Sequence, residues 1–167
     1  MQKVNFIKDE MFILTISGAF AHNKIYRNGV AAENKIKFRD DIRSFLGNFE
    51  NKYKNKITEE EHLVILDKFK KDITIAGKNI LEGSSISFGT VQKILNLYLK
   101  YLWCLGLIVE PPHCPIDRTI LNIIKDYKTN WTKMKKKEYQ SAIEKIKSIK
   151  GYKNIASWEL DEFRRKN

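Results

Sequence analysis

Lys93 and Asp117 are the residues whose types and placement best suit covalent chemistry in this 167-residue chain. Lys93 lies near the start of a long apolar stretch, and Asp117 follows the proline-rich turn 110–115. A lysine amine in a partly desolvated cleft can attack a carbon atom and form a Schiff base. A carboxylate beside it can take a proton from that nucleophile, or stabilise the positive charge on a sugar whose base is leaving. The two side chains converge if the helix after the prolines starts beside the beginning of the apolar helix.

Ordinary structural roles explain the same two residues. A lysine near the start of a helix is commonly exposed, and an aspartate at a helix start caps free amides and meets the positive end of the helix dipole. A salt bridge with no catalytic role would also account for both. Their joint occurrence around an apolar helix and a proline turn favours the chemical interpretation.

The helix that carries Lys93 is expected to span about 89–107 and to form the buried centre of the fold. Nearly every position in it is apolar, which is typical of a helix surrounded by the other helices of its domain. Asn96 and Lys100 follow Lys93 at spacings that place all three on one face, and Gln92 lies beside them. Burial of such a polar stripe costs desolvation unless water, a partner or a ligand meets it. We therefore expect the stripe to line a binding site.

The remaining sequence predicts a mostly α fold, with residues 1–167 forming one globular multi-helix domain around this helix. Only 8 Gly and 3 Pro occur, which favours long helices over many short strands with turns. Thr58 and Glu61 form a predicted capping box. Residues 1–30 could form either a short hairpin or a lead-in helix, because their apolar runs fit both the strand period and the helix period. Helical spacing of apolar residues recurs at 32–53, 58–77, 116–127, 138–149 and 156–165.

The net charge of +11 is an argument about partners rather than fold. Phosphate contacts supply most non-specific affinity for nucleic acid, so double-stranded DNA is the expected partner. A generally lysine-rich surface is the other explanation. The hydrophobic content of 43% excludes a disordered chain. The sequence has no signal-peptide pattern and no apolar run of the roughly 18 residues that a membrane span needs. We therefore expect an intracellular, cytoplasmic protein without a membrane partner, nucleoid-associated if prokaryotic. We also expect a monomer.

Neither a metal nor another cofactor is expected from the sequence. Cys104 and Cys114 are too few for a disulfide scaffold or a four-cysteine cluster, and with His113 they lack the paired spacing of zinc ligands. Cys104 lies in the apolar helix and is interpreted as a small core residue. His113 is interpreted either as a contact to a base or phosphate, or as a turn histidine with no such role.

Further candidate nucleic-acid contacts lie around the central helix and in a lysine-rich region. Residues 125–153 hold ten lysines against three acids, which form either a solvated helix face or a salt-sensitive phosphate track. Trp131 is either a platform for an extruded base or a half-buried residue that covers helix ends. The candidate contacts are Ser87, Gly89, Gln92, Asn96, Lys100, His113, Arg118, Trp131, Lys133, Lys135 and Lys136.

Two short motifs resemble the core of the helix-hairpin-helix DNA glycosylases. Residues 88–96, FGTVQKILN, resemble the glycine-containing hairpin that leads into the helix with the catalytic lysine. Residues 115–118, PIDR, resemble the segment that supplies the catalytic aspartate. The spacing and the proline-rich approach are most similar to the 8-oxoguanine glycosylase and lyase branches. The sequence departs from the family pattern in lacking the second hairpin glycine and in placing Arg118 directly after Asp117.

The resemblance implies an enzyme that extrudes a modified base from duplex DNA and cleaves its N-glycosidic bond. Lys93 would be the nucleophile, Asp117 the activating or stabilising carboxylate, and Gln92, Asn96 and His113 contacts to the base or sugar. A lysine nucleophile further implies strand cleavage through the Schiff base. Two other hypotheses remain open: a non-catalytic nucleic-acid-binding or regulatory domain, such as a phage or mobile-element protein, and a protein-interaction domain whose charge is background.

Overall fold

The computed structural model describes residues 2–149 and 154–162, and within these residues the chain forms seven α-helices and no β-strand. The predicted mostly α fold is confirmed. Three short 3-10 turns connect the helices at Asn51–Lys54, Glu82–Ser84 and Trp131–Lys133. The helices are α1 (Gln2–Phe20), α2 (Ala32–Glu50), α3 (Glu59–Ala76), α4 (Phe88–Cys104), α5 (Arg118–Ile123), α6 (Lys136–Lys147) and α7 (Ile155–Glu162).

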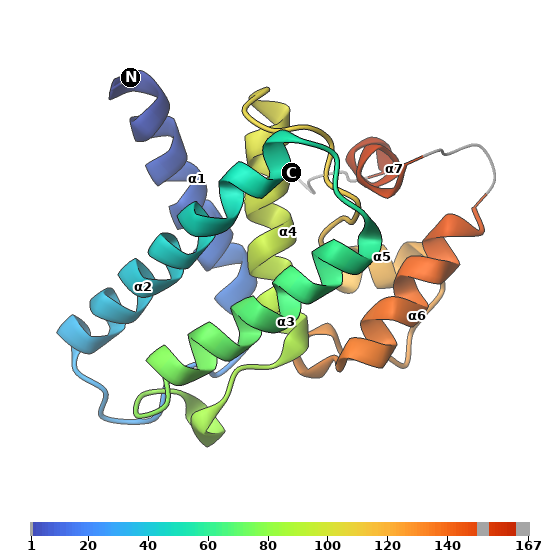
Figure 1. Ribbon diagram of the computed structural model, residues 1–167. Helices are drawn as coiled ribbons and strands as arrows, with labels where there is room; N and C mark the ends of the chain where they lie inside the picture. The colour runs from blue at the N-terminus through green and yellow to red at the C-terminus, as the bar shows by residue number, and fades with distance from the viewer. Residues whose placement is uncertain (1, 150–153, 163–167) are drawn as a thin grey trace.

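Helix α4 is the buried centre of the molecule, as its apolar composition predicts. It packs against α1, α2, α3 and α6, and Figure 1 shows it running through the middle of the fold. The helix ends earlier than the predicted 107, because Gly106 takes a left-handed φ of 70° that reverses the chain. The Leu107 amide then donates to the carbonyl of Leu102 at 3.0 Å, which satisfies one of the last free carbonyls of the helix.

Helix α3 begins at the predicted capping box. The Thr58 amide donates to Glu61 Oε2 at 2.7 Å, and the Glu61 amide donates to Thr58 Oγ1 at 3.1 Å. Gly77 follows the last residue of the helix, as the sequence predicts. The helical pattern at 32–53 divides into α2 and the 3-10 turn Asn51–Lys54.

Residues 2–20 form a single helix, so the alternative of a short hairpin in residues 1–30 is wrong. The apolar residues on both sides of this segment reflect a helix that is apolar around most of its circumference. Its buried residues are Phe12, Thr15, Ile16 and Ala19, all in the second half. The first turns extend past the neighbouring helices, where the N-terminus is marked in Figure 1, and Lys8 and Asp9 then form ion pairs with Glu50 and Arg43 of α2.

The chain after α4 returns along that helix through the prolines and brings the start of α5 back toward the start of α4. The return begins beside the 3-10 turn, where the Val109 amide donates to the Tyr53 carbonyl at 3.0 Å. Helix α5 is shorter than the predicted 116–127, because Lys125 takes a positive φ of 55°. The predicted last helix is present as α7, and its residues 163–165 lie outside the described residues.

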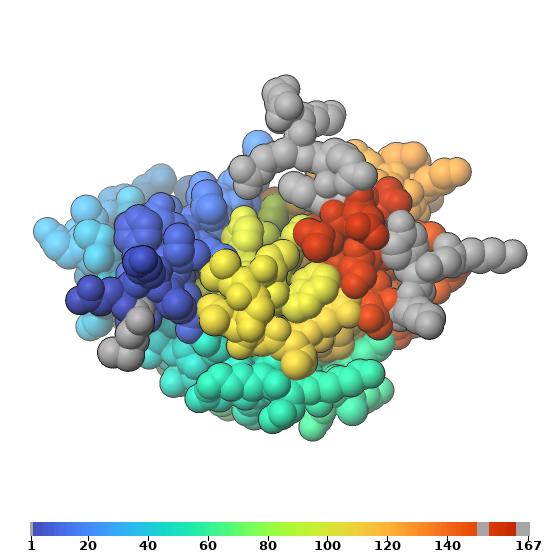
Figure 2. All heavy atoms as spheres, turned by 90° about the horizontal axis from the view of Figure 1, so that it is seen from above, coloured from blue at the N-terminus to red at the C-terminus, as the bar shows by residue number. Residues whose placement is uncertain are grey.

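The C-terminal end of α4 lies at the surface between α1 and α7 (Figure 2). Cys104 is exposed, so its interpretation as a core residue is wrong, whereas Cys114 is buried. A helix long and apolar enough to cross a membrane does not occur in the parts of the chain that the structure describes.

Candidate functional site

Lys93 and Asp117 meet beside the first turns of α4. Lys93 Nζ lies 3.3 Å from Asp117 Oδ2, and the two side chains are 12% and 20% exposed. Asp117 Oδ1 accepts the Ile120 amide at 3.2 Å and so caps α5, as predicted. Lys93 Nζ also lies 4.3 Å from the centre of the Trp131 ring, within the range of a cation–π contact. The pair is therefore partly desolvated, held in place from both sides, and still open to solvent.

Gln92 positions this pair without touching it. Its side-chain Nε2 donates to the Ile116 carbonyl at 2.7 Å, and its Oε1 accepts the Ile116 amide at 3.1 Å. The side chain thus holds both backbone groups of the residue just before Asp117, much as a neighbouring strand would. Gln92 is completely buried, so the structure places it in the interior, not at a surface that a base can reach.

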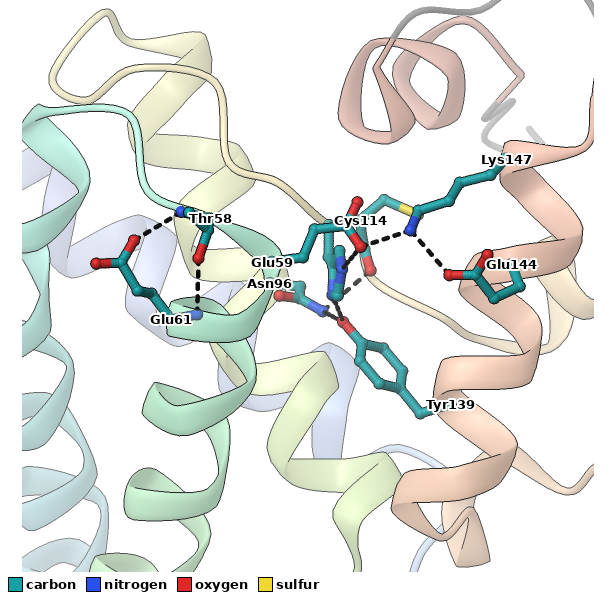
Figure 3. A network of polar contacts seen from close by, with 9 residues as sticks. Thr58, Glu59, Glu61, Asn96, Cys114, Tyr139, Glu144 and Lys147 are labelled. Carbon is teal, nitrogen blue, oxygen red and sulfur yellow. Dashed lines mark hydrogen bonds and ion pairs between the residues drawn. The ribbon is translucent and has the colours of Figure 1, made fainter.

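Asn96, one turn further along α4, also bonds to the chain that follows this helix. Its Nδ2 donates to the Cys114 carbonyl at 3.0 Å and to Tyr139 Oη at 2.9 Å. Tyr139 Oη also lies 2.8 Å from His113 Nδ1. Figure 3 shows these contacts joining α4, the segment 105–117 that returns along α4 (the return segment) and α6. Asn96 and His113 are buried and bonded to their own chain, which differs from the expected contacts to nucleic acid.

Two histidines lie side by side at the end of this network. The rings of His62 and His113 are 4.7 Å apart, and His62 Nδ1 bonds to Tyr53 Oη at 2.8 Å. Burial, reinforced by the neighbouring His113, lowers the pKa of His62 well below its usual value. Burial and the Lys147 ammonium lower the pKa of His113 to about 3. Both imidazoles are consequently neutral at physiological pH.

Lys100 pairs with α7 rather than extending the stripe toward solvent. Its Nζ lies 2.9 Å from Glu159 Oε1 and 2.6 Å from Oε2, and the Glu159 side chain is 4% exposed. Burial raises the pKa of Glu159, while Lys100 acts in the opposite direction. The polar stripe on α4 therefore finds its partners within the protein. Gln92 and Asn96 bond to the return segment, and Lys100 pairs with Glu159 of α7.

Gly89 allows the segment 131–134 to pass directly against α4. A Cβ atom at this position would lie 1.7 Å from the Trp131 carbonyl oxygen, and the Gly89 amide donates to the Met134 carbonyl at 3.0 Å. The glycine thus serves close chain packing, and its amide already has an acceptor. Trp131 is 5% exposed and lies under Lys93, so its ring presents no open face for a base.

The other candidate contacts lie nearer the surface. Ser87 caps α4 through the Thr90 amide at 3.1 Å, and Arg118 donates to the Thr129 carbonyl at 2.9 Å. A groove of about 450 Å³ opens at the start of α4, and Ser87 is among its lining residues. Its basic residues are Lys70, Lys133, Lys135 and Lys136, of which Lys136 pairs with Asp67.

The structure thus places these predicted site residues in three groups. Lys93 and Asp117 converge, and Ser87, Lys133, Lys135 and Lys136 line one groove. A third set is buried and bonded to other parts of the same chain: Gln92, Asn96, Lys100 and His113. Among the described residues, no three histidine, cysteine, aspartate or glutamate side chains could hold a metal ion. An amine held against a carboxylate can exchange a proton with it and attack an electrophilic carbon.

Several residues of these clusters were not found from the sequence. His62 and Tyr139 each lie in an apolar helical pattern, where periodicity gives no sign of a polar partner. Glu159 is separated from Lys100 by a long stretch of chain and no motif links them. Lys70 lies in α3, and only the packing of α3 beside residues 133–136 brings it to the groove. No protein-family model, curated protein or solved structure matches this chain.

Proposed function

We propose that this protein is a DNA-binding base-excision enzyme that extrudes a modified base and cleaves its N-glycosidic bond. The observation that carries the proposal is the meeting of Lys93 and Asp117 at 3.3 Å in a partly desolvated position. The proposed partner is double-stranded DNA with a modified base, bound by a protein that works in the cytoplasm.

The two side chains can complete the reaction between them. Lys93 passes a proton to Asp117 Oδ2, and the freed Nζ lone pair forms a bond to C1′ of the sugar. The electrons of the glycosidic bond leave with the base, which takes up the proton from Asp117. The Asp117 carboxylate then takes the second proton from Nζ and passes it to O4′ as the C1′–O4′ bond opens, and the Nζ lone pair completes a protonated Schiff base with C1′.

The basic groove at the start of α4 supports a DNA partner. Lys70, Lys133 and Lys135 line it, and no acidic side chain pairs with these three ammonium groups in the described residues. Each lysine that contacts a phosphate of duplex DNA should contribute about 0.9 to the slope of log affinity against log salt. Lys70→Gln and Lys133→Gln are each expected to lower that slope by about this amount.

Borohydride trapping on duplexes with abasic, oxidised and deaminated sites tests the chemistry. Hydride addition to the Schiff base gives a stable amine that links protein and DNA. The expected result is an adduct that forms with the unaltered protein and disappears in Lys93→Arg. Arginine keeps a cation beside Asp117 and Trp131, so DNA affinity should change little. Lys137→Gln, which removes an exposed lysine of the same region, is the matched control and should leave the adduct intact.

A non-catalytic nucleic-acid-binding or regulatory domain is the second candidate. It is favoured by the internal contacts of Gln92, Asn96 and His113, which leave these residues unavailable to a base. On this hypothesis Lys93 and Asp117 form a structural ion pair. Salt-sensitive DNA binding with neither trapped adduct nor released base on any duplex would establish this second function and exclude the first.

A further inference from the structure

Helix α1 and the groove beside it form a knob and a hole on the same chain. The groove has a volume of about 460 Å³ and lies between α1 and α2. Its apolar lining residues are Phe12, Ile13, Ile16, Phe20 and Ile36. The knob is Phe6, which is 62% exposed on the part of α1 that extends past the neighbouring helices.

Six of the twelve exposed large hydrophobic residues in the described part of the chain lie on these two helices. Ile13 and Ile36 are 55% and 51% exposed on the two sides of the groove, and Val4, Ile7 and Leu14 are also exposed on α1. A helix that is apolar around its circumference is normally covered on all sides. Contiguous apolar patches of more than a few hundred Å² on a soluble protein usually mark an interface.

We infer, in place of the monomer expected from the sequence, that the groove is filled by the α1 helix of a second copy of this chain, which forms a two-fold dimer. A knob and a hole on one surface are self-complementary, so each chain can fill the groove of the other in a closed pair. The first turns of α1 extend past their own fold, and a partner that reaches equally far can cover them. The symmetry-related α1 meets this requirement.

The charges around the knob and the hole complement each other. Asp9 and Glu10 follow the knob along α1, and the charged residues that line the hole are Arg39, Asp40 and Arg43. Within one chain Asp9 pairs with Arg43, whereas Glu10 and Arg39 have no ion-pair partner in the described part of the chain. Glu10 beside each knob can therefore pair with Arg39 beside the hole of the other copy, which adds one favourable charge contact to the apolar one.

Sedimentation equilibrium of the full chain tests the dimer. The salt concentration should be about physiological, because repulsion between two copies of charge +11 is then screened beyond roughly 8 Å. The unaltered protein is expected to give the mass of two chains at micromolar concentration. Phe6→Asp removes the knob and Ile36→Asp blocks the hole, so each variant alone should weaken pairing at least tenfold. Both residues are more than half exposed, so the fold should be retained, which circular dichroism checks.

Mixing the two variants gives the sharper test. A mixed pair keeps one intact contact, the Phe6 of the Ile36→Asp chain in the groove of the Phe6→Asp chain, so the mixture should pair more tightly than either variant alone. Val64→Asp and Ile75→Asp change residues of similar exposure on α3, and they should leave the mass unchanged. A single-chain mass for the unaltered protein, or pairing that both groove variants leave intact, would overturn the inference. The dimer and the base-excision chemistry are independent, because trapping through Lys93 does not use α1.

Discussion

Gly89 occupies a position where no side chain fits, because the segment 131–134 crosses α4 at this residue. An alanine Cβ would meet the backbone oxygen of Trp131 at 1.7 Å, and a backbone atom cannot rotate away as the end of a flexible side chain can. Gly89→Ala must therefore displace the segment that carries Trp131 against Lys93. We expect it to lower the free energy of unfolding by about 3 kcal/mol, measured by urea denaturation.

Gly47 provides the matched control within the same fold. It lies inside α2, and a Cβ atom there would meet nothing within 4 Å. Because glycine inside a helix is less favourable than alanine, Gly47→Ala should raise the free energy of unfolding by about 0.5–1 kcal/mol. Equal effects of the two substitutions would show that close packing does not account for Gly89.

At the scale of elements, Gln92 and Asn96 on α4 hold the return segment in place through buried hydrogen bonds. Gln92→Met keeps the volume of the side chain but leaves the Ile116 amide and carbonyl without partners in the interior. The expected loss of unfolding free energy is about 2–6 kcal/mol, since each of the two unpaired buried groups costs about 1–3 kcal/mol. Trapping through Lys93 should also weaken, because Asp117 follows Ile116. Gln140→Met, at an exposed position of α6, should change neither stability nor trapping.

Lys100 of the polar stripe holds α7 against α4 through a buried ion pair with Glu159. Lys100→Met leaves the carboxylate of Glu159 without its cation, which typically costs about 3–5 kcal/mol. Lys100→Met combined with Glu159→Leu removes both charges and should recover most of that loss. Chemical denaturation of the two single variants and the double variant measures the coupling. Additive losses, with no recovery in the double variant, would contradict a paired role.

Periodicity and capping predicted the helices well, whereas the function of the polar stripe required tertiary contacts. The apolar pattern of α4 indicates burial, and Thr58 with Glu61 indicates a helix start, because both signals are local. The same sequence cannot say whether Asn96 meets a ligand or the Cys114 carbonyl, because that depends on where the return segment lies. Lys93 and Asp117 were predicted to converge from the assumption of a returning helix, and the structure contains that return.

At the scale of the whole molecule, α3, α4, α6 and the return segment meet at one buried polar cluster that contains two neutral histidines. Among the described residues His113 Nε2 has no hydrogen-bond partner; it lies 3.7 Å from Glu59 Oε2, and the Lys147 ammonium pairs with the same carboxylate. A proton on either ring would therefore place a charge in the interior with one exposed carboxylate to offset it. The junction of these elements is accordingly the part of the fold most sensitive to acid.

The sign of this acid sensitivity follows from the direction of the pKa shifts. The unfolded chain binds protons on His62 and His113 near pH 6.5, whereas in the folded protein the pKa of His113 is about 3 and that of His62 lies well below its usual value. Stability should therefore be constant above about pH 7 and fall as the pH decreases from about 6.5, by up to roughly 1.4 kcal/mol per pH unit for each histidine. Urea denaturation between pH 7 and 4.5 measures this slope before most carboxylates titrate. His113→Asn should make the slope shallower, and a flat profile for the unaltered protein would contradict the neutral histidine pair.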